Sequence, residues 1–401
     1  MNKVFVTGKG IISAIGNNAD EALDSVRNSR SGLGGLQHIS TRFKDQLCVG
    51  EVKATDKELK EICNLPLSAK FTRTALLGII AAREAMQNAG IRDDLAKFRT
   101  GIISATSVGG MAIAENLYLD FLNPEKTGDF LEYIGTHECG DSTEKIADYL
   151  GIKDFLSTIN TACSSSANSI MLGARLIKQG LLDRVIVGGT DSLSRFTING
   201  FVALNILDVE PCKPFDAGRK GLNLGEGAGF LVLESERAAV GKNCICELSG
   251  YGNANDAFHQ TASSPTGEGA YSAMKKTITL SGIDPTEINY INAHGTGTEI
   301  NDLSEGIAIE RIFNKNVPSI SSTKAFTGHT LAASGGIEAV LSVLAIEHNI
   351  TYANPQHQQQ MPELDFSPAK EIRTGNVIKH VLSNSFGFGG NTSSLLFSAC
   401  K

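Results

Sequence analysis

Short apolar runs alternate with helix-like runs along this chain, and this alternation constrains its fold more than any other feature. Residues 3–7, 184–187 and 230–233 have the composition of buried strands, whereas 74–89 has the apolar spacing of a helix that ends at Gly90. Alternating strands and helices are typical of sheets whose faces are covered by helices. The sequence therefore predicts an α/β fold.

The two halves of the 401-residue chain repeat one pattern. Residues 155–161 are strand-like and lead through a loop of small residues into a helix, and 317–323 lead through a glycine loop into another helix. Each half also opens with a strand that runs into glycine. We therefore expect a duplicated α/β unit, with halves at residues 1–240 and 241–401.

Composition and charge exclude several classes of function. The formal net charge of −7 argues against non-specific binding of nucleic acid. The first residues lack the apolar stretch of a secretory signal, and no apolar run approaches the ~20 residues that span a bilayer. We therefore expect a cytoplasmic protein without membrane contact, whose eight cysteines stay free in a reducing environment.

Two motifs are too incomplete to predict a cofactor or a metal site, and a third is absent. Gly8 and Gly10 follow a strand, but Ser13 stands where a dinucleotide-binding fingerprint has its third glycine. Cys244 and Cys246 have neither the spacing nor the partner pair of a zinc site. The sequence also lacks a phosphate-binding P-loop. It therefore predicts neither a metal nor a bound cofactor.

Cys163 is the first candidate for chemistry. It stands in the segment NTACSSSA, where a strand ends and a helix with apolar spacing begins. At a helix N-terminus the dipole and the free amides favour a thiolate, and small neighbours leave room for a substrate. The alternative is a buried and inert cysteine, which is the commoner role.

Two histidines and two charged residues follow in the second half. His294 ends a strand-like run and enters a glycine–threonine loop that we expect to open on a cleft, and His329 precedes the next helix. A lysine at Lys324 would disfavour imidazolium and keep both rings as neutral donors, and Glu338 could hold that lysine. The alternatives are histidines satisfied by local hydrogen bonds and a surface ion pair between Lys324 and Glu338.

The loop NSFGFGGN at residues 384–391 mixes glycine with phenylalanine. It could present a backbone N–H to an oxyanion while a phenyl ring gates a pocket. It could also be a tight turn between two strands. One cysteine, two histidines and this loop together predict covalent catalysis by a thiol.

In this order, the motifs resemble those of the β-ketoacyl-acyl-carrier-protein synthases of the thiolase superfamily, of the elongating Cys-His-His type. The shared motifs are TACSS around Cys163, NAHGTGT around His294, STKxxTGH ending at His329, NSFGFGG around Phe388 and KPFDxxRxGxxxGEGAG at 213–229. The resemblance covers essentially the whole chain. It implies a thiolase-like fold, a duplicated αβαβα arrangement in five layers, and a homodimer.

The resemblance also implies roles for these residues. Cys163 would accept an acyl chain from the phosphopantetheine arm of an acyl carrier protein, so no other cofactor is needed. His294 and His329 would hold the thioester of malonyl-carrier protein while it loses CO₂, and the carbanion would attack the acyl chain to give a 3-oxoacyl product. Backbone N–H groups of Cys163 and Phe388 would form the oxyanion hole, and Phe388 would gate the acyl pocket. Further positions implied to support catalysis are Lys324, Glu338, Thr296 and Thr298.

The pathway and the docking partner are less constrained. Acyl carriers are acidic, so Lys70 and Arg73 are candidates for docking, or else plain surface charges. The short link 205–212 and the run GLNLGEGAG resemble members that build aryl-polyene or flexirubin-like pigments. The alternative to fatty acid or polyketide and polyene elongation by a homodimer is therefore a subunit of a heterodimeric ketosynthase/chain-length-factor pair. A chain-length factor itself lacks the nucleophile, and a thiolase would carry a second cysteine where Phe386 and Phe388 stand.

Overall fold

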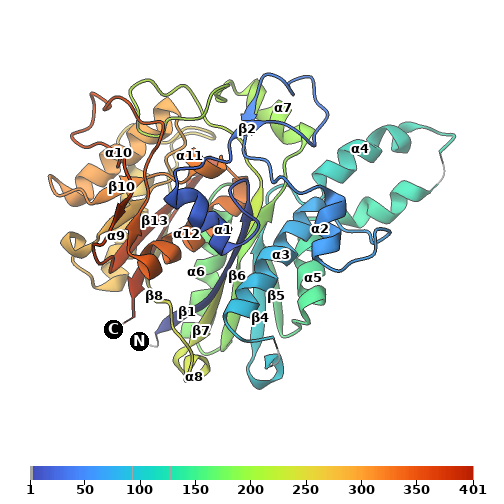
Figure 1. The fold of residues 1–401 in the computed structure, drawn as a ribbon, viewed down its shortest axis with the longest axis horizontal. Coiled ribbons are helices and arrows are strands. Elements are labelled where there is room, and N and C mark those ends of the chain that lie inside the picture. Colours follow the sequence, from blue (N-terminus) through green and yellow to red (C-terminus); the bar gives the residue numbers. More distant parts are fainter. Residues whose placement is uncertain (1–2, 93, 127, 401) are drawn as a thin grey trace.

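The computed structural model describes residues 3–92, 94–126 and 128–400, whose main strands form one mixed sheet of ten (Figure 1). The N-terminal half contributes, in spatial order, β5 (Phe155–Ile159), β4 (Thr100–Ala105), β6 (Arg184–Asp191), β7 (Gly227–Ser235) and β1 (Val4–Ser13). The C-terminal half contributes β10 (Ser319–Ser321), β9 (Tyr290–Asn292), β13 (His380–Gly387), β14 (Asn391–Ala399) and β8 (Cys246–Asn255). The halves meet where β1 pairs with β8.

Both halves of the sheet have the same topology. β4 lies parallel to β5 and β6, and β7 is antiparallel to β6 and β1. In the second half, β9 lies parallel to β10 and β13, and β14 is antiparallel to β13 and β8. The duplication expected from the sequence is therefore present in strand order and direction. The chain crosses from one half to the other between α8 (Glu236–Ala239) and β8.

Helices cover and separate the two half-sheets. The outer pair on the N-terminal half is α3 (Arg73–Asn88) and α5 (Cys139–Leu150), and the outer pair on the C-terminal half is α9 (Glu268–Ser281) and α10 (Glu299–Phe313). Between the half-sheets lie α6 (Ser165–Lys178) and α12 (Ser334–His348), which contact strands of both. The layer order is αβαβα, as predicted.

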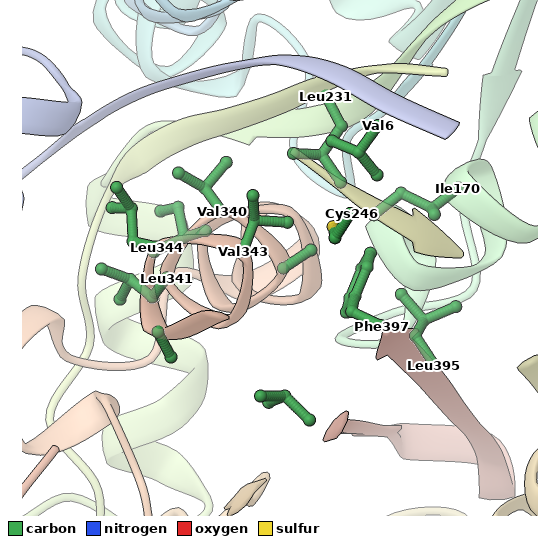
Figure 2. Close-up of a cluster of buried hydrophobic side chains, with 14 of the residues drawn as sticks. Val6, Ile170, Leu231, Cys246, Val340, Leu341, Val343, Leu344, Leu395 and Phe397 are labelled. Atoms are coloured by element: carbon green, nitrogen blue, oxygen red, sulfur yellow. The ribbon is translucent and has the colours of Figure 1, made fainter. Parts of the chain in front are cut away.

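The central helix α12 is surrounded by protein, and all of its residues from Ser334 to Ile346 are buried. The helical run Leu331–His348 is long and apolar enough to cross a membrane, yet 89% of it is buried inside the protein. Figure 2 shows side chains of this helix within one apolar cluster that also includes residues of β1, β7, β8, β14 and α6. A Cβ at Gly336 would lie 2.4 Å from the carbonyl oxygen of Gly229, so glycine allows α12 to approach β7 closely.

Strand β1 continues further than the sequence predicted. The expected strand stops near Thr7, but the pairing with β7 extends to Ser13. Gly8 and Gly10 do not end the strand; they let α3 pack directly on it, because a Cβ at Gly8 would lie 2.2 Å from the carbonyl oxygen of Ala85. Glycine here marks a close approach of backbones rather than a turn.

Helix α4 (Met111–Leu122) projects from the body of the molecule, at the right of Figure 1, and none of its residues is buried. It is followed by η2 (Asp129–His137). The other short elements are α1 (Ala19–Arg27), β2 (Gly34–Gly35), β3 (Cys48–Val49), α2 (Asp56–Ile62), η1 (Leu95–Lys97), α7 (Arg195–Ala203), η3 (Pro285–Glu287), α11 (Lys324–Thr327), η4 (Leu331–Ala333), β11 (Ile350–Thr351), β12 (Arg373–Thr374) and η5 (Phe388–Gly390).

Candidate active site

Cys163 lies in a sharp turn between β5 and α6. Ala162, the residue before it, has a left-handed backbone with φ of 52°, a conformation that a residue with a Cβ adopts only under constraint. Ser165 Oγ accepts a hydrogen bond from the N–H of Thr161 at 2.8 Å and so closes the turn. The turn places Cys163, a residue that is 6% exposed, in the wall of a pocket.

The environment of Cys163 corrects the prediction of a thiolate. Burial raises the pKa of this thiol to about 11, and the raised value persists although Lys324 and the backbone N–H of Phe388 both lower it. The loop that brings Phe388 there needs Gly387, because a Cβ at this position would lie 2.8 Å from the Thr161 carbonyl oxygen and 3.0 Å from the Cys163 nitrogen. The thiol is therefore protonated at neutral pH.

His294 follows β9 and lines the same pocket, although it is only 2% exposed. Lys324 Nζ lies 3.1 Å from His294 Nδ1 and donates to the His294 carbonyl oxygen at 2.7 Å. An ammonium group can only donate, so Nδ1 must accept and the ring proton resides on Nε2. The ring is thereby fixed as an Nε2–H donor.

His329 has its tautomer fixed in a different way. The backbone N–H of Leu331 donates to His329 Nδ1 at 3.2 Å, and Ser334 Oγ lies 3.0 Å from the same atom. Nδ1 therefore accepts and Nε2 carries the proton. The two imidazole rings lie 5.4 Å apart and nearly perpendicular, at 88°. Burial first, and Lys324 second, hold the pKa of both rings well below the usual value, so both are neutral donors.

Lys324 and Glu338 form a buried ion pair, not the surface pair that was the alternative. Each side chain is 2% exposed, and Lys324 Nζ donates directly to Glu338 Oε1. The second carboxylate oxygen accepts from Ser385 Oγ at 3.2 Å. Burial raises the pKa of Glu338, and the lysine opposes this shift. The pair places a positive charge beside His294.

The pocket has a volume of about 380 Å³ and is lined by Cys163, His294, His329 and Phe388 among others. Thr296 and Thr298 also line it, with their hydroxyl oxygens 2.9 Å apart. Residues 384–391 include the end of β13 and the turn into β14, as one alternative expected, and Phe386–Gly390 also line the pocket. The oxyanion and gating roles of this segment stay predictions.

Glu305 is a residue of this site that the sequence reasoning missed. Its carboxylate accepts from the backbone N–H of His294 at 3.0 Å and of Gly295 at 2.8 Å, and from Asn384 Nδ2 at 3.0 Å. Burial raises its pKa to about 7. One turn earlier on α10, Asp302 accepts from Thr296 N–H at 3.0 Å. These two acids stand three positions apart on a helix just after the glycine loop. This spacing was the sequence signal that could have placed both side chains against the loop.

Two models of the β-ketoacyl synthase family match this chain. The N-terminal domain model matches residues 1–239, and the C-terminal domain model matches residues 245–357. The chain belongs to the β-ketoacyl synthase family. The resemblance drawn from the motifs is confirmed, and with it the expected enzyme class, an acyltransferase that forms carbon–carbon bonds.

Relatives of this β-ketoacyl synthase match it over nearly its whole length. The 3-oxoacyl-[acyl-carrier-protein] synthase 2 of Staphylococcus aureus (strain N315) is 33% identical over 409 residues, covering 98% of each chain. The ishigamide ketosynthase/chain length factor has a TM-score of 0.92 at 30% identity, with both chains fully covered. A type II polyketide synthase acyl-carrier protein in complex with its ketosynthase bound to the hexaketide has a TM-score of 0.89 at 27% identity, again over both full chains.

The two residues expected to dock a carrier protein occupy different environments in this synthase. Lys70 is exposed, with Nζ 5.2 Å from the centre of the Tyr133 ring. Arg73 is not a surface charge, because its side chain is 11% exposed and donates to Glu226 at 2.7 Å and to Asp56 at 2.8 Å. A guanidinium committed to two carboxylates is a structural cation, so the docking interpretation is wrong for Arg73.

No cluster of three or more His, Cys, Asp or Glu side chains suited to a metal ion is found within residues 3–92, 94–126 and 128–400 of the synthase. The cysteines described there are likewise free thiols.

Proposed function

We propose that this protein is a 3-oxoacyl-[acyl-carrier-protein] synthase that joins malonyl-carrier protein to an acyl chain carried on Cys163. The observation that carries the proposal is the convergence of four groups on one pocket: the Cys163 thiol, the Phe388 backbone N–H and the Nε2–H donors of His294 and His329. A thiol beside donors for a developing oxyanion suits acyl transfer through a covalent thioester.

The first step transfers the acyl chain to the enzyme. Cys163 Sγ attacks the thioester carbonyl carbon of the acyl-carrier substrate, and the oxyanion that forms is bound by the backbone N–H groups of Cys163 and Phe388. The carbon–sulfur bond to the phosphopantetheine arm then breaks. The proton that Cys163 loses ends on the departing thiol, so the step is balanced and no external base is consumed.

The second step forms the carbon–carbon bond. The carbonyl oxygen of the malonyl thioester accepts from His294 and His329 Nε2–H, and the bond to the carboxylate breaks to release CO₂. The resulting enolate attacks the acyl carbonyl on Cys163, the bond to Sγ breaks, and the thiolate takes up a proton. Neutral donors suit this step because negative charge builds on the thioester oxygen, and one such donor can lower the barrier by ~3 kcal/mol.

The charged pair and the two threonines have supporting roles in this scheme. Lys324, held by Glu338, keeps His294 in the Nε2–H tautomer and opposes its protonation. Thr296 and Thr298 offer hydroxyl groups along the pocket to the amides of the arriving arm. The phosphopantetheine arm enters with the carrier protein, so the protein itself needs no bound cofactor or metal. Lys70 remains the candidate contact for the acidic carrier.

A second thiolase-like chain is the proposed partner, and a homodimer in the cytoplasm is the proposed state. The apolar side chains exposed on α4 and η2 support a partner: Tyr118, Leu119, Phe121, Leu122, Leu131 and Ile134. β5 is an edge strand of the sheet, and helix α5 contacts both β5 and η2. The ishigamide relative is a ketosynthase/chain length factor pair, so a heterodimer in a pigment or polyene pathway is the alternative. Native mass of the protein purified alone distinguishes the two.

The decarboxylation step can be tested without an acyl primer. Purified protein is mixed with malonyl-carrier protein, and CO₂ release is followed together with the mass of the carrier. Conversion to acetyl-carrier protein is expected, and His294→Ala or His329→Ala lowers its rate about 100-fold or more through loss of one donor. Unchanged rates in both variants would remove the histidines from the mechanism.

A further inference from the structure

Helix α7 contributes Phe201 to the lining of the pocket, and this ring contacts the loop that carries Phe388. Phe201, near the end of α7, stacks on Phe388 with ring centroids 5.9 Å apart and an interplanar angle of 17°. Both rings line the pocket of Cys163. The position of α7 therefore bears directly on the loop whose backbone N–H faces the thiol.

The first turn of α7 is held by a carboxylate from the projecting helix α4. Glu115 Oε1 accepts from the N–H of Arg195 at 2.9 Å, and Oε2 accepts from the N–H of Phe196 at 2.8 Å. Arg195 in turn donates through Nη2 to the Glu115 carbonyl oxygen at 3.1 Å. The first N–H groups of a helix have no partners within it, and its N-terminus attracts negative charge. One side chain thus binds two helix amides and joins α4 to α7.

We propose that Glu115 is a positioning residue for acyl transfer. By fixing the N-terminus of α7 it holds Phe201 against Phe388, and so keeps the Phe388 N–H aimed at Cys163. This rests on the proposed function, in which that N–H stabilises the oxyanion. Glu115 is not among the residues that line the pocket, so it acts only through α7.

The fold of α7 does not depend on Glu115 alone. Ile198, in the middle of the helix, is fully buried in an apolar cluster with Leu193 and Leu222. Ser194 also accepts from the N–H of Thr197 at 3.1 Å and caps the same turn. Loss of the carboxylate should therefore leave α7 folded but free to shift as a unit, which moves Phe201 relative to Phe388. The expected change is in the rate of transfer rather than in folding.

The test compares Glu115→Gln with Asp120→Asn. Glutamine keeps the size of the side chain but removes its charge and one acceptor. Asp120 is also on α4, and its carboxylate lies 3.8 Å from Lys126. Single-turnover acylation of Cys163 is followed by intact mass over a range of acyl-carrier concentrations. Glu115→Gln should lower the maximal rate about tenfold with the half-saturating concentration unchanged, and Asp120→Asn should behave as wild type.

Two further readouts separate positioning from general damage. Alkylation of Cys163 by iodoacetamide needs no oxyanion donor and depends on the Phe388 N–H only through the pKa of the thiol. It should therefore slow much less in Glu115→Gln than acylation does. In a Phe201→Ala background, where the stack is already lost, Glu115→Gln should slow acylation less than twofold. An unchanged acylation rate in Glu115→Gln, a full tenfold effect in the Phe201→Ala background, or alkylation slowed as much as acylation would each overturn the proposal. Absence of acylation in the wild type would instead contradict the proposed function.

Discussion

At the scale of single residues, the site depends on charges whose burial is not visible in the sequence. Lys324 and Glu338 stand 14 positions apart, and lysine and glutamate are residue types that usually pair on the surface. In the structure both are buried beside His294. Arg73 was a candidate for docking because it is basic. Its ion-pair partner Glu226 lies 153 positions away, so the local sequence could not reveal the pair. The motifs predicted which residue types meet. They predicted the lowered pKa of the two histidines from Lys324, but not that burial is the larger cause, nor that burial raises the pKa of Cys163, because long-range packing decides burial.

The thiol of Cys163 provides a prediction about pH. Its pKa of about 11 means that the thiolate fraction rises tenfold per pH unit through the neutral range. Alkylation by iodoacetamide should therefore accelerate about 100-fold between pH 7 and pH 9, measured as the mass gain that Cys163→Ala lacks. A rate that levels off below pH 8 would show that the helix N-terminus and Lys324 outweigh burial.

The buried ion pair provides a prediction about stability. Lys324→Met leaves the Glu338 carboxylate without its cation, and the loss of one partner of a buried pair costs about 3–5 kcal/mol. Urea unfolding of the variant should show this loss, and the double variant Lys324→Met/Glu338→Gln should recover part of it. The exposed pair of Lys57 and Glu61 is the control, and Lys57→Met should change nothing measurable. Equal losses in the single and double variants would contradict a coupled pair.

At the scale of elements, glycines were the signals that the sequence reasoning interpreted least well. Gly8 and Gly10 suggested the end of a strand or a nucleotide site, but they allow α3 to pack on β1. The positions of α3, α6 and α12 agree with the predicted runs, because their apolar spacing is set by the faces they bury. Close approaches between backbones depend on tertiary neighbours, so a local pattern does not reveal them.

Gly387 is the glycine whose replacement should be most damaging to the site. A methyl group there would lie 2.8 Å from the Thr161 carbonyl oxygen and would push the Phe388 loop away from Cys163. Gly387→Ala should slow acylation of Cys163 by ~10-fold or more, because a small displacement of the groups that react lowers the reaction rate strongly. Gly140→Ala is the matched control. Its Cβ meets open space in helix α5, so it should raise stability by about 0.5–1 kcal/mol and leave the rate unchanged. Wild-type acylation in Gly387→Ala would contradict this geometry.

At the scale of the whole molecule, the pocket belongs to both halves of the duplicated fold. The first half supplies Cys163 at the end of β5, and the second supplies His294, His329 and Phe388 from loops near β9, α12 and β13. The motifs predicted this set of residues, and the αβαβα layers explain why they meet. The motifs do not predict what covers the apolar side chains that α4 exposes.

The projecting helix provides a prediction about assembly. Leu119 on α4 is 75% exposed, so in a lone chain Leu119→Glu should be harmless, whereas at an interface it would bury a charge. Native mass spectrometry should therefore show dimers for the wild type and monomers for Leu119→Glu. Leu181→Glu, at a side chain 57% exposed beyond α6, should stay dimeric. Dimers in both variants would place the interface elsewhere, and a monomeric wild type would favour a subunit that requires a different partner.

The central claim is that Cys163 carries the acyl chain. Its most direct test is intact-protein mass spectrometry of the wild type and of Cys163→Ala after mixing with a panel of acyl-carrier proteins. The account predicts a mass gain equal to one acyl group in the wild type and none in the variant, with the preferred acyl group indicating the pathway. An adduct that persists in Cys163→Ala, or no adduct with any carrier, would contradict it.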